Sequence, residues 1–233
     1  MSKAKTPARR PIAVAEDDGL VMPEAWRRRP WIPVLVSVVV VAAVLGAGLV
    51  IDQALQSPRP TALDSCVTST QVGPHQFSGR QPICITTTRT YQATINTTQG
   101  QVVIQLYPEI APVTVNNFVV LALNGYYDGM PWKTEDWVVQ SGDPAGDGTG
   151  GPGYTLPDEP NTTPSWGIGA VGMARPITGQ INGSQFFIER AAWPGAGPTA
   201  VYNRFGTVIK GMDKAELLTG PSDRITSITI QVG

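Results

Sequence analysis

The sequence predicts a mainly β domain, a barrel or a sandwich, that follows a single membrane-spanning helix. From about Thr88 to the C-terminus, many short strand-like runs are separated by turns, and only two helical segments interrupt them. Before that domain, residues 31–51 form an uncharged run of 21 residues. A helix of this length spans about 30 Å, which is the hydrocarbon thickness of a bilayer.

The charge distribution predicts the orientation of the apolar run. The 233 residues carry a net charge of −1, which does not favour binding to nucleic acid. Residues 1–30, however, hold seven Lys or Arg against four acidic residues, and Arg27, Arg28 and Arg29 lie directly before the run. Because positive charge stays on the inner side of a membrane, we expect a cytoplasmic tail and an extracytoplasmic C-terminal domain.

A cleaved signal peptide and a buried core helix are the alternatives for residues 31–51. A signal peptide has an apolar region of about 7–15 residues and a small-residue cleavage site, which is not clear after this longer run. A core helix is rarely so long and apolar on every face. We therefore expect an uncleaved signal anchor.

Two cysteines, Cys66 and Cys84, follow the apolar run and lie 18 positions apart. In an oxidising compartment such a pair predicts a disulfide, worth about 3 kcal/mol on the chain-entropy model. A metal site is not expected, because the single histidine, His75, brings the ligand count only to three and it is expected to be a solvated loop residue. Residues 52–87 are thus predicted to be a linker or a small extension held by the disulfide.

The predicted elements of the β domain, residues 88–233, follow one another closely. Residues 90–108 read as two strands around a turn at Gly100, because apolar and polar residues alternate on both sides of it. A helix is predicted over 111–123, where apolar residues keep helical spacing before Asn124-Gly125. The other predicted strands are 138–143, 166–174, 184–189, 205–211 and 225–232, and the second helix is 212–218.

Two further patterns are not expected to carry function. The glycine-rich residues 146–153 resemble a phosphate-binding loop, but no Gly-Lys-Ser/Thr follows and no helix begins there. Asn96, Asn161 and Asn182 each begin an Asn-x-Ser/Thr sequence, and we expect them to be turn residues rather than glycan acceptors.

Several short motifs run in a fixed order through residues 90–233. The strongest is NGSQFFI, and the others are LYPEIAPVTVNNF (106–118), YYDG (126–129), VVQSGD (138–143), DGTGGPGY (147–154), GMA (172–174) and YNRFGTVIKGMD (202–213). Together they resemble the cyclophilin family of peptidyl-prolyl cis–trans isomerases. The resemblance implies an eight-stranded antiparallel barrel with two helices. Because side chains fill the barrel of this family, it also implies a site on the outer surface.

The implied reaction explains the absence of an obvious nucleophile. Rotation about an Xaa–Pro bond has a barrier near 20 kcal/mol but makes and breaks no bond, so it needs no metal, general base or cofactor. It needs an apolar pocket for the proline ring, partners for the flanking peptide and a donor aimed at the prolyl nitrogen.

The resemblance assigns substrate contacts to residues on several strands. Gln140 corresponds to the glutamine that hydrogen-bonds the substrate backbone, and Arg175 replaces an asparagine whose main chain pairs with the substrate. Phe187 corresponds to the floor of the proline pocket, whereas Phe186 is expected in the core because neighbouring strand residues face opposite ways. The other expected contacts are Trp137, Val138, Ala174, Gln185 and Tyr202, and Trp193 is expected near the family's tryptophan.

One position departs from the family pattern. The family's catalytic arginine donates to the prolyl nitrogen, but no arginine stands here. Counting back from Trp137 assigns the position to Lys133, which we favour, and counting forward from Gly129 assigns it to Thr134. Lysine keeps the cation but lacks the planar fork of donors, so we expect reduced activity. Arg175 would partly compensate if its side chain turned into the cleft.

We therefore expect an isomerase in the plasma membrane of a bacterium, which assists the folding of exported proteins at Xaa–Pro bonds. Its expected partners are proline-containing polypeptides and, through residues 31–51, the membrane. The alternatives are a weak or inactive cyclophilin-like subunit of a larger membrane complex and a chaperone that binds proline peptides without catalysis.

Overall fold

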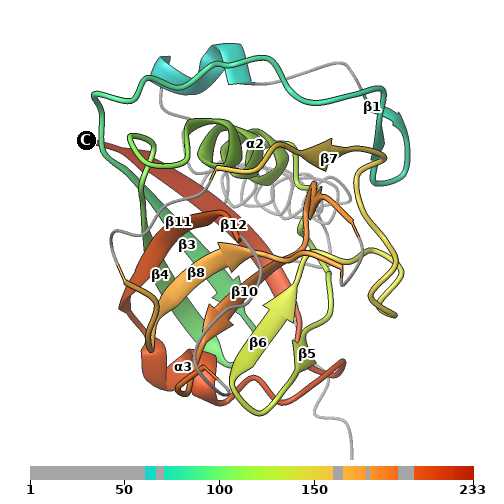
Figure 1. Cartoon of the computed structure of the whole chain (residues 1–233), viewed down its shortest axis with the longest axis vertical. Coiled ribbons are helices and arrows are strands. Elements are labelled where there is room, and N and C mark those ends of the chain that lie inside the picture. The colour runs from blue at the N-terminus through green and yellow to red at the C-terminus, as the bar shows by residue number, and fades with distance from the viewer. Residues whose placement is uncertain (1–60, 67–70, 160–164, 177–178, 194–201) are drawn as a thin grey trace, which may run out of the picture. The chain divides into compact units, whose positions relative to one another are not determined.

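The domain is built on one curled antiparallel sheet of eight strands (Figure 1). The computed structural model describes residues 61–66, 71–159, 165–176, 179–193 and 202–233. Across the sheet the strands are ordered β12-β3-β4-β11-β8-β10-β6-β5. Their bounds are β3 (Tyr91–Thr97), β4 (Gly100–Leu106), β5 (Lys133–Thr134), β6 (Val138–Ser141), β8 (Ala170–Met173), β10 (Phe186–Glu189), β11 (Arg204–Lys210) and β12 (Ile225–Val232).

The two outer strands of the sheet approach each other and bring it toward closure. Pro131, before β5, forms an isolated antiparallel bridge with Arg224, before β12. Beside it, Trp132 N donates to Asp223 O at 3.1 Å. The predicted eight-stranded antiparallel barrel is confirmed, and this contact protects most of the edge that an open sheet would expose.

Two helices, α2 (Pro112–Leu123) and α3 (Met212–Glu216), lie at opposite ends of the barrel (Figure 1). Both were predicted, and α3 is two residues shorter than expected. The Phe118 side chain of α2 enters the barrel, where its ring centroid lies 5.5 Å from that of Phe186 and 5.2 Å from that of Phe205. Side chains thus fill the interior, which leaves the outer face for a binding site.

The predicted extension before the barrel is folded against it. Its elements are a 3-10 helix, η2 (Thr61–Cys66), and the hairpin strands β1 (Gln71–Gly73) and β2 (Gln76–Phe77). The predicted disulfide between Cys66 and Cys84 is present. This part of the chain is therefore a structured segment.

The extension also shares the core of the barrel domain. Leu63, Phe77 and Ile85 are buried in the main hydrophobic core, and Asn116 of α2 accepts from Cys84 N at 2.8 Å. The predicted boundary at residue 88 thus lies inside one compact unit, Pro58–Gly233. Of the two predicted alternatives, a linker or a small extension held by the disulfide, the described residues before 88 form the second.

Other sequence predictions differ from the structure. Asn182, predicted to be a turn residue, is the second residue of the short strand β9 (Ile181–Asn182). Asn96 lies within β3, where its Nδ2 donates to Ser227 Oγ at 2.9 Å, and is not a turn residue. The strand predicted from Trp166 begins only at Ala170, because Ala170 N donates to Gly167 O and closes a turn. His75 is partly buried by an edge-on contact with Tyr126. A separate two-stranded sheet joins β7 (Thr155–Leu156) and β9 (Ile181–Asn182).

The predicted membrane span falls outside the part of the chain that the structure describes, as does Asn161. Among the described residues, none of the helices has the length and apolar character needed to cross a bilayer.

Candidate functional site

A row of residues crosses five neighbouring strands on the outer face of the barrel. Lys133 of β5 pairs with Gln140 of β6, and Gln140 pairs with Phe187 of β10. The row continues from Phe187 to Gly172 of β8 and from Gly172 to Arg204 of β11. Residues paired directly across antiparallel strands present their side chains on the same face. We call these five residues the outer row.

The adjacent row faces the interior. Val139, Ile188 and Val171 pair with one another across β6, β10 and β8, and all three are fully buried in the main core. Thr134 pairs with Val139 and its Oγ1 donates to Leu218 O at 3.1 Å. Since strand neighbours alternate between faces, Thr134 lies on the inner side and Lys133 on the outer side.

A cluster of apolar and aromatic side chains lies on the outer row, and we call it the pocket because the resemblance places the proline pocket here. Its floor consists of Val138, Ala174 and Phe187, all buried in a cluster separate from the main core, whereas Phe186 belongs to the main core as expected. Four partly buried rings surround this floor. The centroid of each ring lies 4.1 to 5.9 Å from the centroid of a neighbouring ring. These rings are Trp137, Trp166, Trp193 and Tyr202.

Trp166 is the pocket residue that the sequence analysis missed. Its ring stacks on that of Phe187, with centroids 5.7 Å apart and planes 21° apart. Both rings lie over Gly172, where an added Cβ would come within 2.6 Å of Trp166 and 2.8 Å of Phe187. The signal in the sequence is the glycine between alternating apolar residues of β8, since a glycine inside a strand often marks a close approach.

A pair of glutamines lies beside the pocket. Gln140 Nε2 donates to Gln185 Oε1 at 2.7 Å. The Gln185 amide nitrogen donates in turn to the carbonyl oxygens of Gly148, at 3.0 Å, and Gly150, at 2.7 Å. Gln185 is almost fully buried, so these bonds settle the orientation of its amide and direct its oxygen at Gln140.

The glycine-rich residues 146–153 supply the carbonyl oxygens that accept from Gln185. The Asp143 carboxylate accepts from the backbone N–H groups of Ala145 at 2.9 Å, Gly148 at 2.5 Å and Gly150 at 3.0 Å. The loop is therefore folded around the Asp143 carboxylate, and its Gly148 and Gly150 carbonyls accept from Gln185.

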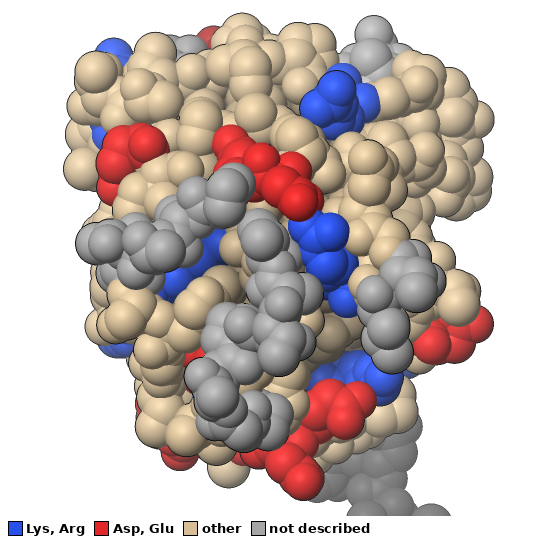
Figure 2. Space-filling view, in the orientation of Figure 1, with Lys and Arg blue, Asp and Glu red and all other residues tan. Residues whose placement is uncertain are grey.

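The described residues contain no group of three or more His, Cys, Asp or Glu side chains arranged to hold a metal ion. On the face seen in Figure 2, basic and acidic side chains are interspersed among uncharged residues.

Comparison with known proteins decides the family. A family model described as cyclophilin type peptidyl-prolyl cis-trans isomerase/CLD matches residues 92–231. The chain belongs to this family. The predicted enzyme class, a peptidyl-prolyl cis–trans isomerase, is thereby confirmed.

Individual cyclophilin relatives cover the same part of the chain. Peptidyl-prolyl cis-trans isomerase B of Bacillus subtilis is 42% identical over 115 residues, which are 48% of this chain and 78% of the relative. The isomerase ppi1 of Schizosaccharomyces pombe is 37% identical over 140 residues, which are 56% of this chain and 88% of the relative. A crystal structure of a Cryptosporidium parvum cyclophilin superposes with a TM-score of 0.55 at 27% identity, covering 61% of this chain and 98% of that one.

Lys133 stands at the exposed end of the outer row. It begins β5, a strand of two residues at the edge of the sheet, and its Nζ lies 3.2 Å from Glu135 Oε1. More than half of each side chain is exposed. The cation is thus next to Gln140 in the row, and its exposed ion pair with Glu135 is of the weak surface kind.

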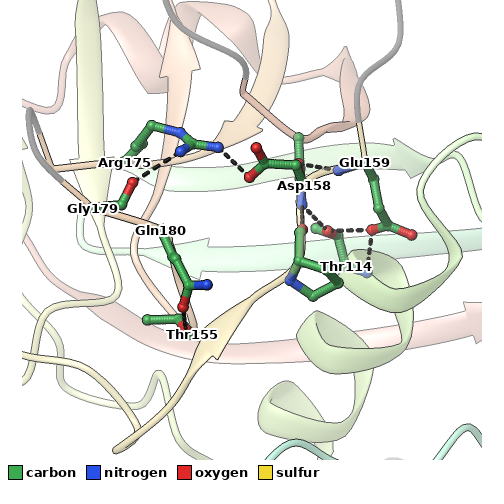
Figure 3. Close-up of polar contacts among 9 residues, drawn as sticks. Thr114, Thr155, Asp158, Glu159, Arg175, Gly179 and Gln180 are labelled. Atoms are coloured by element: carbon green, nitrogen blue, oxygen red, sulfur yellow. Dashed lines mark hydrogen bonds and ion pairs between the residues drawn. The ribbon is translucent and has the colours of Figure 1, made fainter.

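Arg175 is held beside the site by a polar network (Figure 3). Its guanidinium forms an ion pair with Asp158, and its Nη1 donates to Gly179 O at 2.9 Å. Glu159, which follows Asp158 in the chain, accepts from Val113 N and Thr114 N at 2.9 Å each and so caps α2. These contacts draw the Arg175 side chain toward the Asp158 loop, so we do not expect it to take over the role of the family arginine.

A buried carboxyl, Glu189, lies on the same face as Phe187 and was also missed. Its Oε2 accepts from Gly167 N at 2.5 Å, and within the described residues its Oε1 has no hydrogen-bond partner. Burial raises the pKa of the Glu189 carboxyl, and the Gly167 bond and the charge of Arg204 oppose that shift. Burial also lowers the pKa of the Arg204 guanidinium. The Arg204 guanidinium lies against Trp166, with its Cζ 5.9 Å from the ring centroid.

Proposed function

We propose that this cyclophilin isomerises Xaa–Pro bonds of exported polypeptides on the outer side of a bacterial plasma membrane. The observation that carries the site assignment is the outer row, in which a cation, a glutamine and a pocket phenylalanine are consecutive cross-strand neighbours. The membrane location is supported by the uncharged residues 31–51 with their basic flank and by the Cys66–Cys84 disulfide, which suits an oxidising compartment.

In the proposed mechanism the pocket holds the proline ring while the peptide flanking it stays fixed. Phe187, Val138, Ala174 and the surrounding aromatic rings receive the proline, since an apolar ring gains from leaving water. The Gln140 amide and the main chain at Arg175 hold the flanking backbone. Rotation then occurs about a bond whose barrier is about 20 kcal/mol in water.

Lys133 supplies the electrostatic part of the proposal. As the Xaa–Pro bond twists, conjugation is lost and the prolyl nitrogen gains a lone pair that a nearby donor stabilises. An ammonium group on a flexible stem holds this position less rigidly than a guanidinium fork. We therefore propose turnover that is reduced relative to arginine-containing cyclophilins but not abolished.

A second candidate function follows from the same replacement. A cyclophilin-like subunit of a larger membrane complex would keep the pocket and the barrel without needing the arginine. Such a protein would bind proline peptides without accelerating their isomerisation. A non-catalytic chaperone would behave in the same way.

The test is proline-peptide turnover by the full chain, combined with gentle purification from membranes. Turnover by a chain that purifies alone supports the isomerase. Stoichiometric partners without turnover support the accessory subunit, and peptide binding without turnover or partners supports the chaperone. Protease protection of the C-terminal domain in intact cells tests its extracytoplasmic location.

A further inference from the structure

The hairpin of the N-terminal extension lies against the glycine-rich loop of the site (Figure 1). Gln76 Nε2 donates to Gly151 O at 2.9 Å, and Phe77 N donates to Pro152 O at 2.9 Å. The first bond comes from a side chain and the second from the main chain. Two consecutive residues of β2 are thus hydrogen-bonded to two consecutive residues of the loop.

The contact leaves little space between the two segments. A Cβ added to Gly153 would come within 2.9 Å of Gln76 Oε1 and 3.2 Å of Phe77 O. Gly153 also has a φ of +95°, a conformation that favours glycine. The loop is thus shaped to accept the hairpin.

The extension is itself firmly attached to the barrel. Phe77 is buried, with its ring centroid 6.0 Å from that of Tyr126. The disulfide joins Cys66 to Cys84, and Asn116 of α2 donates from Nδ2 to Pro82 O at 2.9 Å. The hairpin can therefore act as a fixed support for whatever it contacts.

The supported loop carries the acceptors of Gln185. Gly150, directly before Gly151, accepts from Gln185 Nε2 at 2.7 Å and from Asn182 Nδ2 at 3.1 Å. The Gly151 and Gly150 carbonyls belong to neighbouring peptide units that meet at Gly151 Cα, so holding the first at Gln76 limits how far the second can shift. Without that restraint the Gln185 amide, and through it Gln140, would lose its alignment.

We propose that the extension is part of the isomerase site, with Gln76 as a positioning residue. Its bond to Gly151 holds the glycine-rich loop so that Gln185 presents its oxygen to Gln140 and leaves the Gln140 amide oriented for the substrate backbone. The inference rests on the proposed roles of Gln140 and Gln185. It assigns the extension a part in catalysis beyond that of a link between the membrane span and the barrel.

The test compares Gln76→Glu with Gln71→Glu in the full chain. Glu has the shape of Gln but, when ionised, cannot donate, so the Gly151 carbonyl would face a carboxylate. Gln71 is the matched control, because it lies in the same hairpin, is exposed and donates to Gly73 O at 3.2 Å, within its own hairpin. Both variants place one negative charge on the hairpin.

We expect Gln76→Glu to lower kcat/KM for a proline peptide about fivefold, which is typical for the loss of one aligned hydrogen bond, while the melting temperature stays within two or so degrees. The side-chain amide NMR resonances of Gln185 and Gln140 should shift. Gln71→Glu should change neither. A Gln76→Glu chain with the parental kcat/KM and unshifted amide resonances would overturn the inference.

Gln76→Ala provides the second variant, because it removes the donor without adding charge. Equal losses in Gln76→Ala and Gln76→Glu support positioning by the bond, and a loss in Gln76→Glu alone attributes the effect to charge and overturns the inference. If the parental chain shows no turnover, the proposed function fails, and the Gln185 and Gln140 resonances still decide whether Gln76 positions them.

Discussion

Two cations occupy the opposite ends of the outer row, and their surroundings differ. Lys133 lies on an edge strand, with more than half of its side chain exposed and Glu135 as a surface partner. Arg204 is 5% exposed, and its Cζ lies 5.9 Å from the ring centroids of Tyr107 and Trp166. Burial lowers the pKa of its guanidinium, and the charge of Glu189 opposes that shift.

The comparison shows that the position of a strand in the sheet decides what a cation can do. At the edge, water solvates the Lys133 ammonium, so the cation can approach a substrate at small cost. In the middle of the sheet, Arg204 is desolvated and held by aromatic faces, so it stabilises the wall of the site. The same face of one barrel thus holds one cation proposed for chemistry and one for structure.

The largest expected effect comes from Arg204→Met. This change keeps most of the apolar stem but removes the guanidinium that donates to Ser165 O and lies over the Tyr107 and Trp166 rings, and we expect a loss of about 3 kcal/mol in the free energy of unfolding. Chemical denaturation of the full chain measures it. Lys210→Met is the control, because Lys210 lies on the same strand but is exposed, and it should change stability by no more than about 0.5 kcal/mol. Equal stabilities of the two variants would remove the distinction between the cations.

The next effect concerns turnover at the other end of the row. We expect Lys133→Ala to lower kcat/KM about tenfold and Lys133→Arg to raise it about threefold, since a guanidinium offers a more rigid donor to the prolyl nitrogen. Protease-free proline-peptide assays measure both. Thr134→Ala, on the inner side, should leave kcat/KM unchanged and cost about 1 kcal/mol of stability through its bond to Leu218. If Lys133→Arg gave no gain, the assignment of Lys133 to the arginine position would be wrong.

A smaller effect is expected in the pH dependence of stability. Because the pKa of Glu189 is raised in the folded chain, the folded state binds this proton more tightly than the unfolded chain does. Its contribution to stability is therefore present at low pH and is lost as pH rises above the ordinary Glu value of 4.5. Thermal midpoints of the parent and Glu189→Gln, compared from pH 4 upward, should diverge in favour of the variant. If the thermal midpoints of the two proteins changed in parallel with pH, the raised pKa of Glu189 would be contradicted.

The smallest effect is expected for Glu135→Gln, which removes the partner of Lys133. A surface ion pair contributes about 0–1 kcal/mol, so stability should hardly change. Turnover should rise by less than about threefold at low salt, because Lys133 no longer has to leave Glu135, and the difference should vanish at high salt. A loss of turnover would instead mean that Glu135 holds Lys133 in its working position.

Much of the fold was predictable because it follows from local patterns. Alternating burial along β3, at Tyr91, Ala93 and Ile95, matches the alternation that predicted the strand. The same period-two rule separated Phe186, in the main core, from Phe187, in the pocket.

Less of the site was predictable, because its remaining members are defined by neighbours distant in sequence. Trp166 reaches Phe187 only because the turn at Gly167 interrupts the expected strand. Counting along the chain could not choose between Lys133 and Thr134. The pairing of β5 with β6 places Lys133 on the outer face.

The sequence alone determined the family, the strand alternation, the cysteine pair and the residue types of the pocket, because each is written in short motifs or in a period of two. Only the tertiary structure decided that Lys133 lies on the outer face, that Trp166 covers Gly172, and that the extension contacts the glycine-rich loop through Gln76. The physical reason is that strand register, burial and hydrogen bonds between distant segments arise when the barrel closes.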